Sequence, residues 1–266
     1  MAIESSPSGN QMHREVVVRL RKKSLLCAQV AAAVILHGCA SVDKPPRPSE
    51  VLAPATRVFT DPSRGRQIPV LLYGLSHRAK PLVLISHGYG GRNTAYSFIA
   101  NHLAGQGYLV ASVQHELSGD PELPTTGVPS VVRRPSWEQG VRNLKFVIEA
   151  LRKQRAASND RIILVGHSHG GDMSALFVEQ HPRLVQAVFS LDNRRMRLPR
   201  TSRPRICSVR STDQTADEGV LPTPAEVLQH RMVIATVPDL KHNDMWDGAN
   251  PAQKQSVLGV LDRCLR

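Results

Sequence analysis

From residue 67 onward, short apolar runs alternate along the chain with longer segments of helical periodicity. The periodicity is clearest in residues 136–155, where apolar residues recur every three or four positions and so share one helix face. Such alternation predicts an α/β fold, in which a mostly parallel sheet is flanked by helices. The predicted strands cover 67–73, 81–86, 108–114, 161–166, 184–191, 205–210 and 232–237, and the predicted helices cover 94–105, 136–155, 169–181, 223–230 and 250–264.

The segment "LVGHSHGGDMSA", residues 164–175, places a serine among glycines directly after one of the apolar runs. In an open α/β sheet, the loops at the carboxyl ends of the strands form the functional site. Gly166 and Gly170 allow a sharp strand-to-helix turn that lifts the hydroxyl of Ser168 above the sheet, as in a nucleophile elbow. The N-terminus of the following helix would add positive potential beside it. We therefore predict that Ser168 is a nucleophile.

A second glycine-rich turn, "ISHGYGG" at residues 85–91, ends another predicted strand. Acyl transfer through a serine needs two backbone N–H donors for the tetrahedral oxyanion. One belongs to the residue after the nucleophile and one to the loop after this strand. This requirement predicts an oxyanion hole formed by the backbone N–H groups of His169 and Tyr89.

The segments "SHGYGG" (86–91) and "GHSHGG" (166–171), with the predicted strand order, resemble the α/β-hydrolase superfamily over about residues 67–266. The segment "VASVQHE" (110–116) resembles relatives of dienelactone hydrolase, including bacterial cutinase-like esterases and platelet-activating-factor acetylhydrolases. The resemblance implies the α/β-hydrolase fold and a serine hydrolase that cleaves a carboxylic ester through an acyl-enzyme intermediate. Few residues follow Asp192 before the next predicted strand, so we expect no large cap domain.

In this superfamily the nucleophile is followed by the acid and then by the histidine, which lies after the last strand. His242 follows the predicted strand 232–237 and is the predicted general base, whereas His230 precedes that strand. For the acid, Asp213 occupies the place that the resemblance to cutinase-like esterases implies, and it is the first choice. Asp192 occupies the place of the acetylhydrolase branch, and Asp217 is a third candidate.

The same residues would serve an acyltransferase or a thioesterase, and a non-catalytic binding lipoprotein on this fold is a further alternative. The sequence predicts no cofactor for such a triad and has no metal-binding spacing. The formal net charge of +12 comes without a nucleic-acid-binding motif and with only 4% aromatic residues, which argues against nucleic acid as a partner. We expect a small ester as the substrate.

Two further segments are expected to flank the site. The loop "NRRMRLPRTSRPR" contains six arginines between Arg194 and Arg205, and it would either steer an anionic ester, lie near a phospholipid surface or be an ordinary solvated loop. The proline- and glycine-containing segment 115–136 is the other predicted wall.

The N-terminal region resembles a bacterial lipoprotein signal. Residues 1–38 combine a basic run, the apolar stretch "LLCAQVAAAVIL" and small residues, which is typical of a signal peptide. "LHGC" resembles a lipobox that would lipidate Cys39, although His37 departs from the usual small residue, and Ala40 fits export to an outer membrane. We expect a lipidated Cys39 with a proline-rich tether over 39–55, a hydrolase domain over 56–266, and a periplasmic or cell-envelope location with membrane attachment through Cys39.

After cleavage of residues 1–38, Cys207 and Cys264 remain in the predicted domain. An oxidising compartment would allow them to form a disulfide. Cysteines on one strand and one helix are more often small buried hydrophobic residues, so the sequence favours two free thiols.

Overall fold

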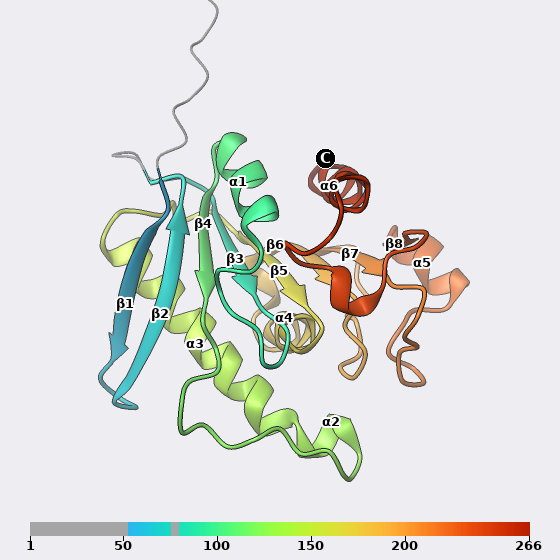
Figure 1. Ribbon diagram of the computed structural model, residues 1–266, viewed down its shortest axis with the longest axis horizontal. Coiled ribbons are helices and arrows are strands. Elements are labelled where there is room, and N and C mark those ends of the chain that lie inside the picture. The colour runs from blue at the N-terminus through green and yellow to red at the C-terminus, as the bar shows by residue number, and fades with distance from the viewer. Residues whose placement is uncertain (1–52, 76–79) are drawn as a thin grey trace, which may run out of the picture. The chain divides into compact units, whose positions relative to one another are not determined.

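The computed structural model describes residues 53–75 and 80–266, which form one mixed sheet with helices on both faces (Figure 1). The strands are β1 (Ala55–Asp61), β2 (Arg66–Tyr73), β3 (Leu82–Ser86), β4 (Leu109–Val113), β5 (Ile162–His167), β6 (Val185–Leu191), β7 (Arg205–Arg210) and β8 (Val233–Thr236). The α-helices are α1 (Ser97–Gly105), α2 (Pro129–Val132), α3 (Arg134–Lys153), α4 (His169–Gln180), α5 (Pro224–His230) and α6 (Pro251–Leu265).

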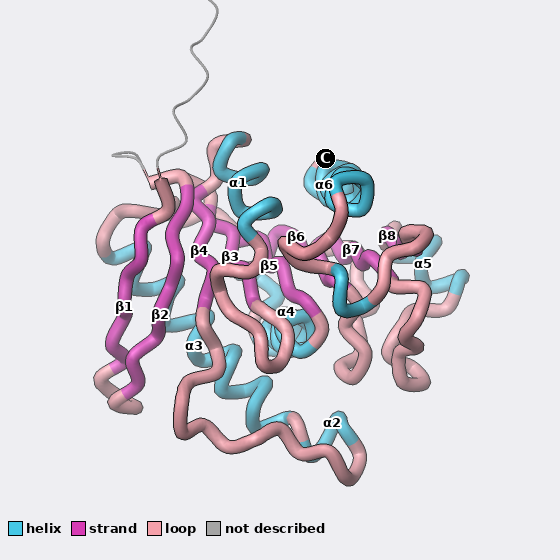
Figure 2. Tube along the Cα trace, viewed as in Figure 1, coloured by secondary structure: helices cyan, strands magenta, loops and turns pink. Residues whose placement is uncertain are grey.

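The strands lie in the order β1-β2-β4-β3-β5-β6-β7-β8. The β1/β2 and β2/β4 pairs are antiparallel, and every other pair in the sheet is parallel. The predicted mostly parallel α/β sheet is therefore confirmed. Because the strands from β3 to β8 run in one direction, the loops that follow them lie at one edge of the sheet (Figure 2).

One strand and one α-helix were not predicted from the sequence. Strand β1 is an edge strand in which only Phe59 and Asp61 are buried, so it lacks the apolar run that identifies the central strands. Helix α2 is a four-residue turn within the segment 115–136. The connection from β6 to β7 is residues 192–204, too short to hold a cap domain.

The core is divided by the sheet into two apolar layers. On one face, α3 and α4 cover the sheet with fully buried residues that include Trp137, Leu144 and Phe177. On the other face, α1 and α6 contribute Ile99 and Leu261 to the second layer (Figure 1). The strands β3 and β5 between these layers are buried throughout, as expected for parallel strands covered on both faces.

Cys207 on β7 and Cys264 on α6 are joined by a disulfide, which corrects the expectation of two free thiols. Both residues are buried, as predicted, but the packing of α6 on the sheet also brings their Cα atoms to 6.0 Å, within the range that a disulfide spans. The distance across that packed interface depends on tertiary structure rather than on sequence spacing.

The predicted signal peptide, lipidated Cys39 and nearly all of the tether lie outside the described residues. In the part of the chain that the structure describes, no helix combines the length and the apolar character that a membrane span requires.

Candidate active site

Ser168 lies at the sharp turn between β5 and α4, and its backbone has a φ of +50°. A positive φ is strained for a residue other than glycine and is retained where the surrounding structure enforces it. Gly166 and Gly170 make the turn possible, because a Cβ atom on either would lie 2.3 Å from a backbone oxygen. The Ser168 side chain makes no capping hydrogen bond to α4. Its hydroxyl is therefore turned away from the helix backbone.

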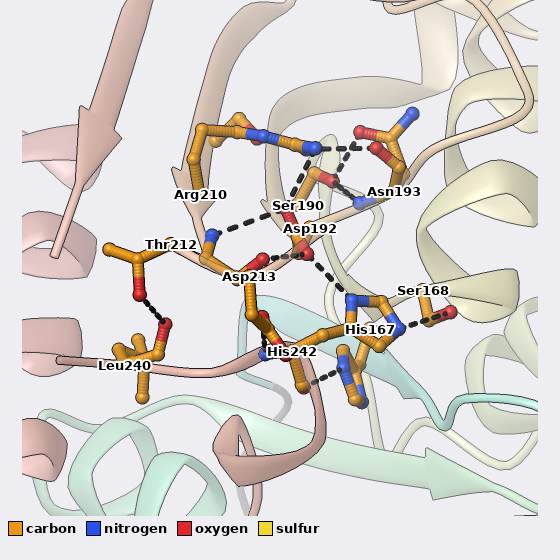
Figure 3. Close-up of polar contacts among 12 residues, drawn as sticks. His167, Ser168, Ser190, Asp192, Asn193, Arg210, Thr212, Asp213, Leu240 and His242 are labelled. Atoms are coloured by element: carbon orange, nitrogen blue, oxygen red, sulfur yellow. Dashed lines mark hydrogen bonds and ion pairs between the residues drawn. The ribbon is translucent and has the colours of Figure 1, made fainter. Parts of the chain in front are cut away.

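The hydroxyl of Ser168 instead contacts His242, which begins a short 3₁₀ turn (His242–Asp244) after β8. Nε2 of His242 lies 3.0 Å from Oγ of Ser168 (Figure 3). Only 5% of His242 is exposed, so the imidazole is held by protein groups rather than by solvent. The two residues predicted as nucleophile and base, 74 positions apart in the sequence, are brought into hydrogen-bond distance.

The other ring nitrogen of His242, Nδ1, lies 2.6 Å from Oδ2 of Asp192. Asp192 follows the end of β6 and is fully buried. Burial alone raises the pKa of its carboxyl. Hydrogen bonds from His242 and Ser211 and the positive charge of Arg210 outweigh that effect and hold the pKa below its ordinary value. Asp192 is therefore a carboxylate that keeps Nδ1 of His242 protonated and leaves Nε2 free to accept a proton.

This geometry favours the alternative acid, Asp192, over the first choice, Asp213. Asp213 is exposed, and its Oδ1 accepts the backbone N–H of His242 at 2.7 Å instead of contacting the ring. It lies three residues past the end of β7, where its carboxylate reaches only the backbone of the loop that carries His242. Asp217, the third candidate, pairs with Arg195. Asp192, the alternative, occupies the position next to the imidazole.

A second, buried histidine fixes the backbone of the His242 loop. Nε2 of His167 lies 3.0 Å from the carbonyl oxygen of His242, and its Nδ1 lies 2.8 Å from the hydroxyl of Tyr96. Burial lowers the pKa of His167 to about 3, so the ring is neutral. It therefore donates from Nε2 to the carbonyl and accepts from Tyr96 at Nδ1, while the Tyr96 oxygen accepts the N–H of Gly88 at 3.2 Å. These bonds link the end of β5 to the loop after β3 and to the loop after β8.

The groups predicted to form the oxyanion hole lie beside Ser168. His169 is the first residue of α4, where backbone N–H groups have no partner within the helix. The N–H of Tyr89 has no hydrogen-bond partner within residues 53–75 and 80–266. Gly90, next to it, donates its N–H to Glu116 at 2.6 Å, which holds this turn against the segment 115–136.

The side chain of His169 is held by two residues of α3. Its Nδ1 accepts the indole N–H of Trp137 at 3.1 Å, and its Nε2 lies 2.9 Å from Oγ of Ser136. Burial lowers the pKa of His169 to about 3, so this ring is neutral as well. The imidazole anchors the first turn of α4 to α3 and contributes no charge to the site.

Ser168, His169 and Tyr89 line one cavity of about 210 Å³. Leu123, Thr125 and Arg133 line it from the segment 115–136 and the start of α3, and Asp172, Arg194 and Arg195 complete it. The two segments predicted to flank the site therefore do so. The volume is smaller than the roughly 300–1,000 Å³ of pockets that hold drug-sized ligands, and it suits a small acyl or alcohol group.

Sequence reasoning missed four residues that support the site: Tyr96, His167, Arg210 and Ser211. The only sequence signal for His167 was its place beside Ser168 in the elbow, and nothing in the sequence related Tyr96 or Arg210 to the site. Among the described residues, no group of three or more His, Cys, Asp or Glu side chains is arranged to hold a metal ion.

A family model described as "Serine aminopeptidase, S33" matches residues 77–191. The matched segment contains the oxyanion turn and Ser168 and ends just before Asp192, so the acid and the base lie outside it. No curated protein matches the chain.

Three similar solved structures belong to proteins of related fold. Dienelactone hydrolase from Anabaena variabilis has 17% identity and a TM-score of 0.55, and the match covers 80% of this chain and 99% of that one. Est1E from Butyrivibrio proteoclasticus has 13% identity and a TM-score of 0.56, with 79% and 98% covered. Ferulic acid esterase from Streptomyces cinnamoneus has 20% identity and a TM-score of 0.50, with 73% and 75% covered. At these identities the likeness shows a shared fold.

Proposed function

We propose that this chain, which has the α/β-hydrolase fold, cleaves carboxylic esters with Ser168 as nucleophile, His242 as general base and Asp192 as the acid. One observation carries the proposal. The hydroxyl of Ser168, the two ring nitrogens of His242 and the carboxylate of Asp192 form a continuous chain of hydrogen bonds at 3.0 and 2.6 Å. A nucleophile, a base and a group that orients the base are what acyl transfer through serine requires.

In the first half of the reaction, Nε2 of His242 takes the proton of Ser168 as Oγ attacks the carbonyl carbon of the ester. The carbonyl electron pair moves onto oxygen, and the N–H groups of Tyr89 and His169 stabilise the resulting oxyanion. Asp192 stabilises the imidazolium without becoming protonated itself. Collapse of the tetrahedral intermediate breaks the ester C–O bond, and the departing alcohol takes the proton from Nε2.

In the second half, water attacks the acyl-enzyme with His242 again acting as base, and the acid product leaves as Ser168 regains its proton. The strained backbone at Ser168 and the hydrogen bonds from His167 hold these groups in place before substrate arrives. Such preorganisation is a large part of what an enzyme contributes to this type of reaction.

The test is hydrolysis of 4-nitrophenyl esters from acetate to octanoate by the chain from residue 40 onward. We expect turnover that falls by a factor of about 10⁴ or more in Ser168→Ala, whereas Ser256→Ala on the exposed face of α6 should match the wild type. Adding an alcohol acceptor and analysing the products separates hydrolysis from acyl transfer. Equal turnover by wild type and Ser168→Ala, or none by either, would contradict the proposal.

We also propose that the chain is exported and anchored to a membrane through a lipid on Cys39. The support is the sequence pattern of residues 1–40, with its basic run, apolar stretch and lipobox-like "LHGC". Expression of the full chain in bacteria with labelled palmitate should label the wild type and leave Cys39→Ala unlabelled. Label in both proteins or in neither would contradict this assignment.

A further inference from the structure

The cavity that Ser168 lines is also lined by three arginines, Arg133, Arg194 and Arg195. They come from two separate segments, since Arg133 precedes α3 and the other two follow Asp192 in the loop after β6. All three are partly buried. Three cations around a cavity of about 210 Å³ are unusual for a site that would only have to hold a neutral ester.

The acidic residues near this cavity do not neutralise all three cations. Arg195 pairs with Asp217, while Arg133 and Arg194 form no ion pair with any described residue. Asp172 also lines the cavity, but its Oδ1 accepts the backbone N–H groups of Arg195 at 3.1 Å and of the following residue at 2.8 Å. His169 is neutral and adds no charge. Arg133 and Arg194 therefore have no direct ion-pair partner among the described residues, and the carboxylate charge of Asp172 acts on both from beyond contact distance.

Both of these arginines also have unused donors. The Nε atoms of Arg133 and Arg194 are buried and have no hydrogen-bond partner within the described part of the chain. Buried polar groups are nearly always hydrogen-bonded, so each exception needs an explanation. Burial and the adjacent charge of Arg195 lower the pKa of Arg194 despite the opposing charges of Asp192, Asp172 and Asp217, and a bound anion would oppose the lowering further.

We infer that the ester cleaved at Ser168 carries a second, anionic group, a carboxylate in its simplest form, which Arg133 and Arg194 bind beside the nucleophile. This inference rests on the proposed esterase function. Guanidinium groups bind carboxylates through paired charge-assisted hydrogen bonds, which fix orientation as well as supply affinity. The bound anion would accept hydrogen bonds from the two buried Nε–H groups and place the ester carbonyl against Ser168.

The test uses two matched pairs of esters, each with one anionic and one neutral member of nearly the same size. The anion lies on the acyl side in mono-4-nitrophenyl adipate, whose neutral counterpart has a terminal carboxamide. It lies on the alcohol side in 4-acetoxybenzoate, whose counterpart is 4-acetoxybenzamide. We expect kcat/KM for the anionic member of at least one pair to exceed that of its counterpart by about tenfold or more.

The preference should disappear in Arg133→Gln and Arg194→Gln and weaken at high salt. Arg197→Gln is the matched control, because Arg197 lies in the same loop, is exposed, pairs with Glu226 and does not line the cavity. This control should keep the full preference. Equal kcat/KM for both members of both pairs, or a preference that Arg133→Gln and Arg194→Gln retain, would overturn the inference.

A binding measurement separates this inference from the proposed function. Calorimetric titration of Ser168→Ala with the adipate pair should show tighter binding of the carboxylate than of the carboxamide, whether or not the wild type turns over esters. Tighter carboxylate binding without turnover would support the anion site and refute the esterase. Turnover without any difference in binding or kcat/KM would refute the anion site alone.

Discussion

The guanidinium of Arg210 and the carboxylate of Asp192 form a buried ion pair, with Nη2 2.7 Å from Oδ1. The two oxygens of the carboxylate have different partners. Oδ1 contacts Arg210, whereas Oδ2 accepts hydrogen bonds from His242 and from the hydroxyl of Ser211. Arg210 also donates to the carbonyl of Asn193 at 2.8 Å, which ties β7 to the loop after β6. The orientation of His242 therefore depends on a residue that never touches the ring.

Arg210→Met should destabilise the protein by about 3–5 kcal/mol, because removing one member of a buried pair leaves the other charge uncompensated. Urea denaturation measures this change. Arg263→Met, which removes an exposed arginine from α6, is the control and should have a small effect. An Arg210→Met protein as stable as the wild type would show that the pair is not needed to hold Asp192.

Asp192→Asn should lower kcat by about 10³–10⁴-fold, because an amide can donate to Nδ1 of His242 and favour the wrong tautomer. Asp213→Asn should have a much smaller effect, since its amide oxygen can still accept the backbone N–H of His242. Steady-state kinetics with one good ester compares the two variants directly. A larger loss in Asp213→Asn than in Asp192→Asn would reverse the assignment of the acid.

The stability of the protein should depend on pH through Asp172, whose pKa burial raises from 3.8 to about 6. Between about pH 4 and pH 6 the folded state binds more protons at this group than the unfolded state, so its contribution falls as pH rises. Asp172→Asn has no such loss, so its free energy of unfolding relative to that of the wild type should rise by roughly 2 to 2.5 kcal/mol between pH 4 and pH 7. Urea denaturation of both proteins at pH 4 and at pH 7 measures this change. A difference in free energy of unfolding that is the same at both pH values would be evidence against the raised pKa.

The disulfide between Cys207 and Cys264 closes a loop with a sequence separation of 57. In the chain-entropy model, a cross-link that closes a loop of this length in the unfolded chain raises the free energy of unfolding by about 4 kcal/mol. We expect the double variant Cys207→Ala/Cys264→Ala to lose stability by up to that amount in urea denaturation. Reductant should bring the wild type close to the variant, and an oxidised wild type no more stable than the variant would contradict the prediction.

The sequence predicted most of the fold because its signals are local. Apolar runs mark the central strands, and the helix periodicity of 136–155 reappears as α3 within two residues at each end. The elbow at Ser168 was likewise readable, since it is one continuous segment of strand, turn and helix. The edge strand β1 was missed because its outward face is polar or exposed along most of its length.

The sequence could not decide between Asp192 and Asp213 because the choice depends on distances between strand ends rather than on spacing along the chain. Asp192 and Asp213 follow the neighbouring strands β6 and β7, and both contact His242, one at the ring and one at the backbone. Only the positions of the loops decide which contact each one makes. The contributions of Tyr96 and Arg210 to the site could not be predicted for the same reason, because their partners lie on other elements.

Activation of Ser168 by His242 can be measured by labelling with a fluorophosphonate, followed by peptide mass spectrometry. Fluorophosphonates phosphonylate activated serines. We expect a single adduct on the peptide that contains Ser168, and we expect its formation to be lost, or slowed by orders of magnitude, in His242→Gln. An adduct on another residue, no adduct in the wild type, or equal labelling of Ser168 in His242→Gln would contradict activation of Ser168 by His242.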